Sequence, residues 1–339
     1  MEAVLLRAIV GLSLFVGAWG ALSSCAANAQ GSVGYQHYTA GDIVSERLRE
    51  PEPGLLLIGG GDWSREAWHW FVKKSGNGHI VIIRASQDGS DGQWIVDEIG
   101  GVASVHTLVF SERSAAFEQP VIELLNRADA IFIAGGDQSN YVRFWKDTPV
   151  EDALNAHMAA GRPLGGTSAG LAILGGAGYG AMAPVAVDSP VALSDPHGPL
   201  VTLVRDFIDA PLLEHVITDT HFSERSRLGR LIAFVAQSRS GPDPDAVGLG
   251  VDEDTSLIVE PGGSARLYST SGGEAWLVRP QGAPSFASDG ALTWRDVDLT
   301  GIGPESLLNL NTFEVDDPAF RRVGHVTDGV LSVSEPMED

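Results

Sequence analysis

Short apolar runs alternate with amphipathic stretches through the first half of the chain. The runs have the length and the Val, Ile, Leu and Phe content of buried strands, and they cover residues 55–58, 80–83, 104–110 and 130–134. Helical stretches lie between or after them at residues 65–74, 91–99, 120–128 and 149–160. Ser64 stands before the first helix as an N-cap. This alternation predicts an α/β fold with a doubly wound, mostly parallel sheet and helices on both of its faces.

The pattern changes after residue 245, where short strands follow one another with only turns between them. We expect strands at 255–259, 265–268 and 274–278, separated by Gly-Gly pairs. They predict an antiparallel C-terminal flank of the same sheet rather than an independent domain. Residues 54–339 are therefore expected to form one α/β domain, preceded by a polar lead segment at 25–53.

The first 24 residues have the pattern of an export signal. Arg7 precedes an apolar run at 8–19, which is too short to be a comfortable membrane span. The sequence LSSC that ends at Cys25 resembles a lipobox, whereas Ala-Asn-Ala at 27–29 offers an ordinary cleavage site. We expect residues 1–24 to be removed and Cys25 to carry a lipid anchor, with a soluble periplasmic or secreted form as the alternative.

Composition narrows the chemistry further. Cys25 is the only cysteine among 339 residues, so disulfides, thiolate metal sites and a cysteine nucleophile are not expected. The chain has 22 Lys and Arg against 44 Asp and Glu, which gives a formal net charge of −22. This charge opposes binding to nucleic acid or to anionic membrane surfaces. A cationic or neutral substrate fits it better, and we expect no metal and no cofactor.

The stretch PLGGTSAGLAILGG at 163–176 contains one candidate nucleophile, Ser168. It follows an apolar approach and lies between Gly166 and Gly170, which is the G-x-S-x-G pattern of a nucleophile elbow. In such a turn the serine hydroxyl stands above the carboxyl edge of the sheet. The backbone N–H of Ala169, at the start of the next helix, would then point at a developing oxyanion.

A serine nucleophile needs a base and an acid that orients it. Among nine histidines, His221 stands out because it follows the apolar run 216–217 at an expected strand end. Carboxylates follow another apolar run, at Asp252, Glu253 and Asp254. The chain order is therefore serine, histidine, acid. The α/β-hydrolase order is serine, acid, histidine, so an esterase or lipase of that fold is not favoured.

Four motifs together resemble the cyanophycinase family of serine peptidases, which also includes aspartyl dipeptidases. They are GGDQ at 135–138, GTSAG at 166–170, DTHFSERSRLGRL at 219–231 and GLGVDEDTSLIV at 248–259. The resemblance implies a flavodoxin-like architecture related to class I glutamine amidotransferases, with serine in place of cysteine. A homodimer is usual for such relatives. This chain departs from the family at Ser226, where cyanophycinases usually have glycine.

Carried over, the resemblance implies that Ser168 is the nucleophile, His221 the general base and Glu253 the acid. Strand alternation also separates Glu253 from its neighbours, because Asp252 and Asp254 would face the opposite side if the strand continued. The remaining implied roles concern the oxyanion and the substrate. Oxyanion N–H groups are expected at Gly136 and Ala169, and substrate contacts at Gln138, Asp219, Arg225, Arg227 and Arg230. A helix from residue 226 onward would place Arg227 and Arg230 on one face, suited to a substrate carboxylate.

The leading hypothesis is an exported serine peptidase that cleaves peptide or isopeptide bonds, of the β-aspartyl type found in cyanophycin, through an acyl-enzyme. A catalytically idle, surface-anchored peptide-binding lipoprotein is the alternative. Such a protein would have little reason to keep Ser168, His221 and Glu253 together. An esterase is a third and weaker hypothesis.

Overall fold

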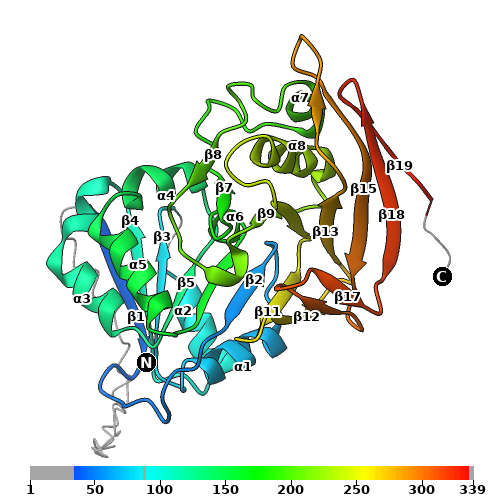
Figure 1. Ribbon diagram of the computed structural model, residues 1–339. Helices are drawn as coiled ribbons and strands as arrows, with labels where there is room; N and C mark the ends of the chain where they lie inside the picture. The colour runs from blue at the N-terminus through cyan, green and yellow to red at the C-terminus, as the bar shows by residue number, and fades with distance from the viewer. Residues whose placement is uncertain (1–33, 87–88, 336–339) are drawn as a thin grey trace, which may run out of the picture.

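The computed structural model describes residues 34–86 and 89–335. Figure 1 shows two sheets, the larger one on the left with helices on both sides and the smaller one on the right. Five strands at the centre of the larger sheet run parallel. Their order is β4 (Ser104–Phe110), β3 (His79–Arg84), β5 (Ala130–Ile133), β6 (Leu164–Thr167) and β2 (Leu55–Ile58).

Antiparallel strands complete both edges of the larger sheet. β1 (Tyr35–Gly41) pairs with β4 at one edge, although the sequence indicated only a polar lead there. The opposite edge continues from β2 through four strands. These are β11 (Thr255–Val259), β12 (Ser264–Ser269), β16 (Leu307–Asn309) and β17 (Glu314–Asp316). The antiparallel flank expected from the sequence therefore fits in part.

The rest of the C-terminal half forms a second sheet, which the sequence did not predict. Its order is β19 (Val330–Val333), β18 (Phe320–Thr327), β15 (Leu292–Ile302), β13 (Ala275–Pro280), β10 (Val247–Val251) and β9 (Val216–Thr220), with β14 (Ser285–Phe286) on β15. Only β9 and β10 run parallel in this sheet. β7 (Ala177–Tyr179) and β8 (Leu203–Arg205) form a separate two-stranded pair.

Helices cover both faces of the parallel strands, which explains the uninterrupted apolar run of β2. Leu55 and Leu57 lie in the core under α3 (Gln119–Arg127), α4 (Gln138–Trp145) and α5 (Pro149–Ala159). Leu56 and Ile58 lie in the core under α1 (Arg65–Lys74) and α2 (Asp91–Trp94), which continues as a π-helical turn over Ile95–Ile99. All four side chains are buried, so neither face of the strand can be polar.

Three further helices border the region between the sheets. α6 (Ala169–Ala172) follows β6, α7 (Ser189–Ser194) packs on α8 (Leu228–Arg239), and short 3₁₀ turns occur at Arg113–Phe117 and Pro211–Leu213. Ser64 caps α1 as expected, since its hydroxyl accepts the N–H of Ala67. One core includes Leu57 of β2 and Leu249 of β10, so the two sheets share buried contacts.

The coarse fold expectation, an α/β protein with helices on both faces of parallel strands, is confirmed. The flavodoxin-like order fits in part. β4, β3, β5 and β6 follow one another as in the 2-1-3-4 portion of that order, whereas the fifth parallel strand is β2, which precedes them in the chain. Within the described ranges, no helix is long and apolar enough to cross a membrane.

Candidate active site

Ser168 occupies a strained turn between β6 and α6. Its φ of 51° and ψ of −118° lie outside the usual regions for a residue with a side chain, at a cost of about 1–3 kcal/mol. The two flanking positions must be glycine because there is no room for a side chain at either of them. A Cβ on Gly166 would lie 2.7 Å from the carbonyl carbon of Gly170, and a Cβ on Gly170 would lie 2.0 Å from the carbonyl oxygen of Ile133. The glycines of the G-x-S-x-G pattern therefore let the turn form against the sheet.

The register of β2 and β6 sets what lies beside this serine. Ile58 pairs with Thr167, and the N–H of Ser168 donates to the carbonyl of Ile58 at 3.0 Å. The glycine loop that follows β2 therefore begins next to Ser168. Both lie at the carboxyl edge of the parallel strands, where active sites of open α/β sheets are found.

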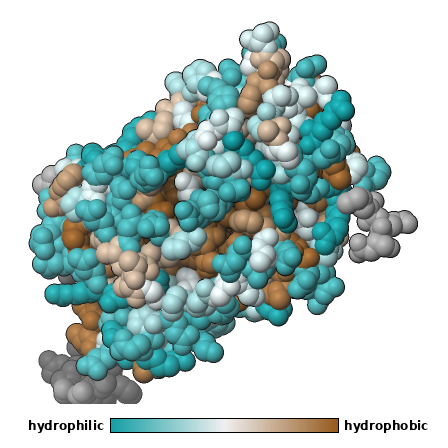
Figure 2. Space-filling view, viewed as in Figure 1, coloured by the Kyte–Doolittle hydropathy of each residue, from teal (hydrophilic) through white to brown (hydrophobic). Residues whose placement is uncertain are grey.

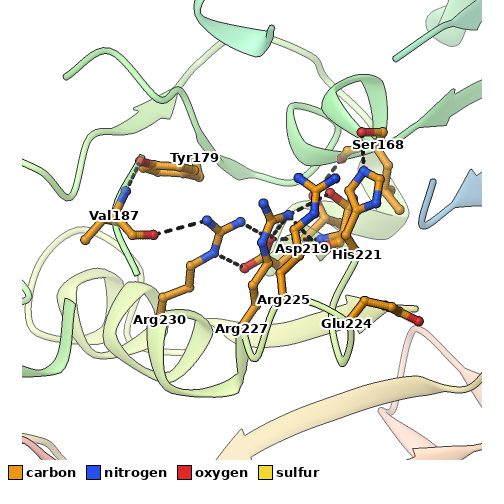
Figure 3. A network of polar contacts seen from close by, with 12 residues as sticks. Ser168, Tyr179, Val187, Asp219, His221, Glu224, Arg225, Arg227 and Arg230 are labelled. Carbon is orange, nitrogen blue, oxygen red and sulfur yellow. Dashed lines mark hydrogen bonds and ion pairs between the residues drawn. The ribbon is translucent and has the colours of Figure 1, made fainter. Parts of the chain in front are cut away.

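His221 follows β9 and faces Ser168 directly. Its Nε2 lies 2.6 Å from the hydroxyl of Ser168, and its Nδ1 lies 2.5 Å from Oε1 of Glu253. Figure 3 shows the imidazole of His221 beside Ser168. A Nδ1–H that donates to Glu253 leaves Nε2 as the acceptor for the serine proton. The arrangement can remove a proton from Ser168 and hold the resulting imidazolium.

Burial lowers the pKa of His221 below its ordinary value, although the hydrogen bond to Glu253 acts in the opposite direction. The charged imidazole loses contact with water, and that loss outweighs the attraction of the carboxylate. A lowered pKa keeps His221 neutral at pH 7, which is the form that can act as a base.

The three adjacent carboxylates after β10 have different partners. Glu253 contacts His221, and its side chain is about one-third exposed. Asp252 instead accepts the backbone N–H groups of Ser223 and Glu274 at 2.9 and 3.0 Å. Asp254 accepts the N–H of Asp62 at 2.6 Å. Of the three, only Glu253 is placed to orient the imidazole.

Two backbone N–H groups near Ser168 are available to a ligand. Within residues 34–86 and 89–335, neither the N–H of Gly136 nor the N–H of Ala169 donates a hydrogen bond. Gly136 lines the same cavity as Ser168, and Ala169 opens α6 directly after the serine. Unpaired N–H groups beside a serine hydroxyl are suited to stabilise an oxyanion.

A cavity of about 920 Å³ opens in front of Ser168 and His221. Its lining includes Gly60, Trp63, Trp94 and Arg225 together with the two catalytic candidates. Trp63 and Trp94 meet edge to face, with ring centroids 5.6 Å apart. In Figure 2 hydrophilic residues cover most of the face in view, and hydrophobic ones show mainly in its hollowed middle. The volume suits a ligand of dipeptide size or larger.

Two of the expected substrate contacts, Asp219 and Arg230, are buried and pair with each other. Asp219 and Arg230 are 1% and 4% exposed. The guanidinium of Arg230 donates from Nε and Nη2 to the two carboxylate oxygens at 2.7 and 2.5 Å, and from Nη1 to the carbonyl of Val187 at 3.2 Å. Figure 3 shows Arg230 turned toward Asp219 and Val187. The fork that was expected to bind a substrate carboxylate thus binds a carboxylate of the chain itself.

The other three expected substrate contacts differ in whether they line the cavity. Arg227 precedes α8 and donates to the carbonyl of Thr220 at 2.6 Å, and burial lowers its pKa to about 10. Gln138 opens α4 and is not part of the cavity lining. Arg225 is different because it lines the cavity, is 53% exposed and lies 3.7 Å from Glu253. Among the three arginines of the motif, it is the one available to a ligand.

The sequence interpretation missed the loop after β2. Gly60, Gly61, Asp62 and Trp63 line the cavity, and Gly60 packs against the imidazole of His221. A signal was present, since three glycines follow an apolar strand at 59–61. The described ranges hold no group of three or more His, Cys, Asp or Glu side chains that could bind a metal ion.

Comparisons with known proteins show similarity to peptidases. The family model described as Peptidase family S51 matches residues 55–265, a range that contains Ser168, His221 and Glu253. Cyanophycinases from Trichormus variabilis and Nostoc sp. are each 31% identical over 254 residues, which cover 70% of this chain and 78% of each relative. A solved peptidase structure from an acI-B1 Actinobacterium is 17% identical, covers 67% of this chain and 90% of its own, and has a TM-score of 0.47.

Proposed function

The chain belongs to peptidase family S51 and is a serine-type peptidase, and on that premise we propose that it cleaves peptide or isopeptide bonds of the β-aspartyl type. The observation that supports this proposal most directly is the unbroken contact from Ser168 through His221 to Glu253, with Ser168 and His221 lining the cavity. Two relatives named cyanophycinase support the isopeptide part of the proposal.

The proposed reaction is acyl transfer in two halves. Ser168 Oγ attacks the amide carbonyl while Nε2 of His221 takes its proton, and the oxyanion is held by the N–H groups of Gly136 and Ala169. The tetrahedral intermediate expels the amine, which receives the proton from His221. Water then attacks the acyl-enzyme with His221 again as base, and Ser168 is regenerated. Glu253 accepts the Nδ1–H of His221 and so holds the imidazole in the correct tautomer.

Arg225 supports a substrate with a free carboxylate beside the scissile bond. A β-aspartyl peptide has such a carboxylate, whereas the interior of an ordinary peptide lacks it. A guanidinium can donate two parallel hydrogen bonds to a carboxylate, which gives orientation as well as attraction. The proposed role therefore moves from Arg227 and Arg230, whose partners are internal, to Arg225.

The test is a set of matched peptides incubated with the purified protein, with product masses and rates as readouts. We expect β-aspartyl peptides to be cleaved faster than their α-linked isomers, and amidation of the free carboxylate to lower kcat/KM by roughly tenfold or more. Arg225→Lys should lower kcat/KM by a similar factor, and only for the acid form. Arg266→Lys, an exposed arginine of β12 outside the cavity, is the matched control. Equal rates on acid and amide forms would rule out carboxylate recognition.

We also propose that the protein is exported and anchored through Cys25. Residues 1–24 and Cys25 lie outside the described residues, so the proposal is supported by the sequence pattern alone. A lipidated protein should fractionate with membranes, and Cys25→Ala should release it or leave it unprocessed. Soluble mature protein that begins at Gln30 would favour the ordinary cleavage site instead.

A further inference from the structure

The loop that follows β2 lies between His221 and the turn that bears Glu253. Three backbone hydrogen bonds hold it there. His221 N–H donates to the carbonyl of Gly59 at 2.8 Å, Asp254 N–H donates to the carbonyl of Gly60 at 2.8 Å, and Gly59 N–H donates to the carbonyl of Thr255 at 2.9 Å. The loop therefore contacts the base, His221, and the two residues that follow the acid, Asp254 and Thr255, without contributing a reacting group.

The fit of this loop against the imidazole leaves no room for a side chain. A Cβ on Gly60, whose φ is 116°, would lie 2.2 Å from Cε1 and 2.6 Å from Nε2 of His221. The peptide backbone of Gly60 itself is thus the surface on which the ring rests. His221 has a φ of 46°, so its own backbone is in the sparsely populated left-handed region. External contacts must hold such a residue in place.

One side chain secures the loop from the acid side. Oδ1 of Asp254 accepts the N–H of Asp62 at 2.6 Å. A Cβ on Gly61 would lie 2.1 Å from that same Oδ1. Asp254 itself is fixed by its left-handed φ of 55° and by its carbonyl, which accepts the N–H of Thr270 at 3.0 Å. The backbone of Asp254 thus holds its carboxylate where it can accept the hydrogen bond from the loop.

We infer that Asp254 is a positioning residue: it holds the Gly60 peptide against the imidazole and so fixes the direction of Nε2 toward Ser168. This inference rests on the proposed function, because it assigns a role in the reactivity of the same serine. Loss of the acceptor releases the N–H of Asp62 and leaves only the backbone hydrogen bonds to hold Gly60 against the ring. A displacement of about 1 Å at a catalytic group can cost about a hundredfold in rate. A loosened loop also admits water to the imidazole.

The experiment compares substitutions of Asp254 in the full protein. Asp254→Gly keeps the left-handed backbone and removes the acceptor, whereas Asp254→Asn keeps both an acceptor oxygen and tolerance of positive φ. Asp328→Gly makes the same change at a left-handed, exposed aspartate in the β18–β19 turn and is the matched control. The readouts are the rate of Ser168 labelling by a serine-reactive phosphonate and the NMR titration of His221.

For Asp254→Gly we expect labelling to slow by about tenfold to a hundredfold, and the titration of His221 to move up toward the ordinary histidine range as the ring gains water. Asp254→Asn should recover most of the rate, and Asp328→Gly should match the unmodified protein. Should Asp254→Gly fail to fold, Gly61→Ala displaces the same carboxylate from the other side and should slow labelling likewise.

Two results would overturn the inference. One is a folded Asp254→Gly protein with unchanged labelling and unchanged His221 titration, which would assign Asp254 to stability alone. The other is Asp254→Asn as slow as Asp254→Gly, which would show that charge rather than the hydrogen bond matters. Failure of the proposed function is distinguishable. In that case Ser168→Ala would not abolish labelling, or peptides would stay intact, while the His221 titration would still report on Asp254.

Discussion

Among the described residues, two partly buried clusters place a serine hydroxyl against a histidine, and only one of these two has the features of an active site. In the first, Ser168 contacts His221 at the end of β6. In the second, Ser104 of β4 lies 3.2 Å from Nε2 of His106 and 2.7 Å from Nδ1 of His79. Burial lowers the pKa of His106 to about 4, as it lowers the pKa of His221. Both clusters therefore combine a serine–histidine contact with a histidine whose pKa is lowered by burial.

The difference lies in what surrounds each pair. Nδ1 of His221 faces the carboxylate of Glu253, whereas Nδ1 of His106 faces His37 at 3.0 Å, with the two rings stacked. Ser104 is fully buried at the first position of β4, and its neighbours in the sheet are Gly41 and His79. Ser168 lies after a strand, on a cavity, beside two unpaired N–H groups. Position after the carboxyl end of a strand and a carboxylate partner for the histidine separate a nucleophile from a structural serine.

The sharpest way to test this comparison is to remove each serine hydroxyl in turn. Ser168→Ala should lower turnover by about a millionfold, because a triad without its nucleophile retains little beyond binding. Ser104→Ala should leave turnover unchanged. Peptide hydrolysis and phosphonate labelling, with circular dichroism as a check of folding, measure both. Substantial activity in the Ser168 variant would make the elbow a structural turn.

The next largest effect should come from the carboxylate that the second cluster lacks. Glu253→Gln should lower kcat by about 10³–10⁴-fold, because the imidazole loses the partner that fixes its tautomer.

In the unmodified enzyme, the acid limb of the pH profile of kcat/KM should lie below the ordinary histidine pKa of about 6.5. The reason is that burial lowers the pKa of His221 and only the neutral ring is a base.

Asp252→Asn is the matched comparison for Glu253→Gln. Asp252 holds backbone N–H groups of Ser223 and Glu274 and does not touch His221. We expect a much smaller loss of kcat than for Glu253→Gln. A larger loss for the Asp252 variant would reassign the orienting acid.

Features that depend on local pattern were predictable from the sequence. Residues 55–58 had to be a buried strand because all four side chains are apolar, and Ser168 was marked by the glycines that its turn requires. The family resemblance was confirmed by the family match. Glu253 was chosen partly from strand alternation, but β10 ends at Val251. The contact with His221 therefore comes from a turn and not from a continuing strand.

Features that depend on distant partners were not predictable. Arg230 had the chemistry of a carboxylate ligand, yet its partner Asp219 is internal, and burial of such a pair cannot be read from spacing. β1 was missed because residues such as Gln36 and His37 make it polar and half-exposed at the sheet edge. β13 was placed in the first sheet because its real neighbours, β10 and β15, are recognised only from pairing.

The smallest expected effect is on the free energy of unfolding at acid pH. It separates the two clusters because His106 should affect stability and His221 should affect activity. The pKa of His106 is about 4 in the folded protein and about 6.5 in an unfolded chain. Desolvation is the main cause, and the neighbouring His37 and His79 add repulsion. Because the unfolded chain binds the proton more readily, the free energy of unfolding is highest above pH 6.5 and falls as the pH drops toward 4.

For one such histidine with some residual contact with water, the loss between pH 7 and pH 5 is on the order of 1–2 kcal/mol. His106→Gln should remove that part of the loss, as measured by urea unfolding at both pH values, while the acid limb of kcat/KM stays where His221 sets it. His325→Gln, at a half-exposed histidine of β18, is the matched control for replacement of an imidazole by an amide outside the cluster. If His106→Gln moved the acid limb of activity instead, the two clusters would be coupled, and a structural role for the second would no longer hold.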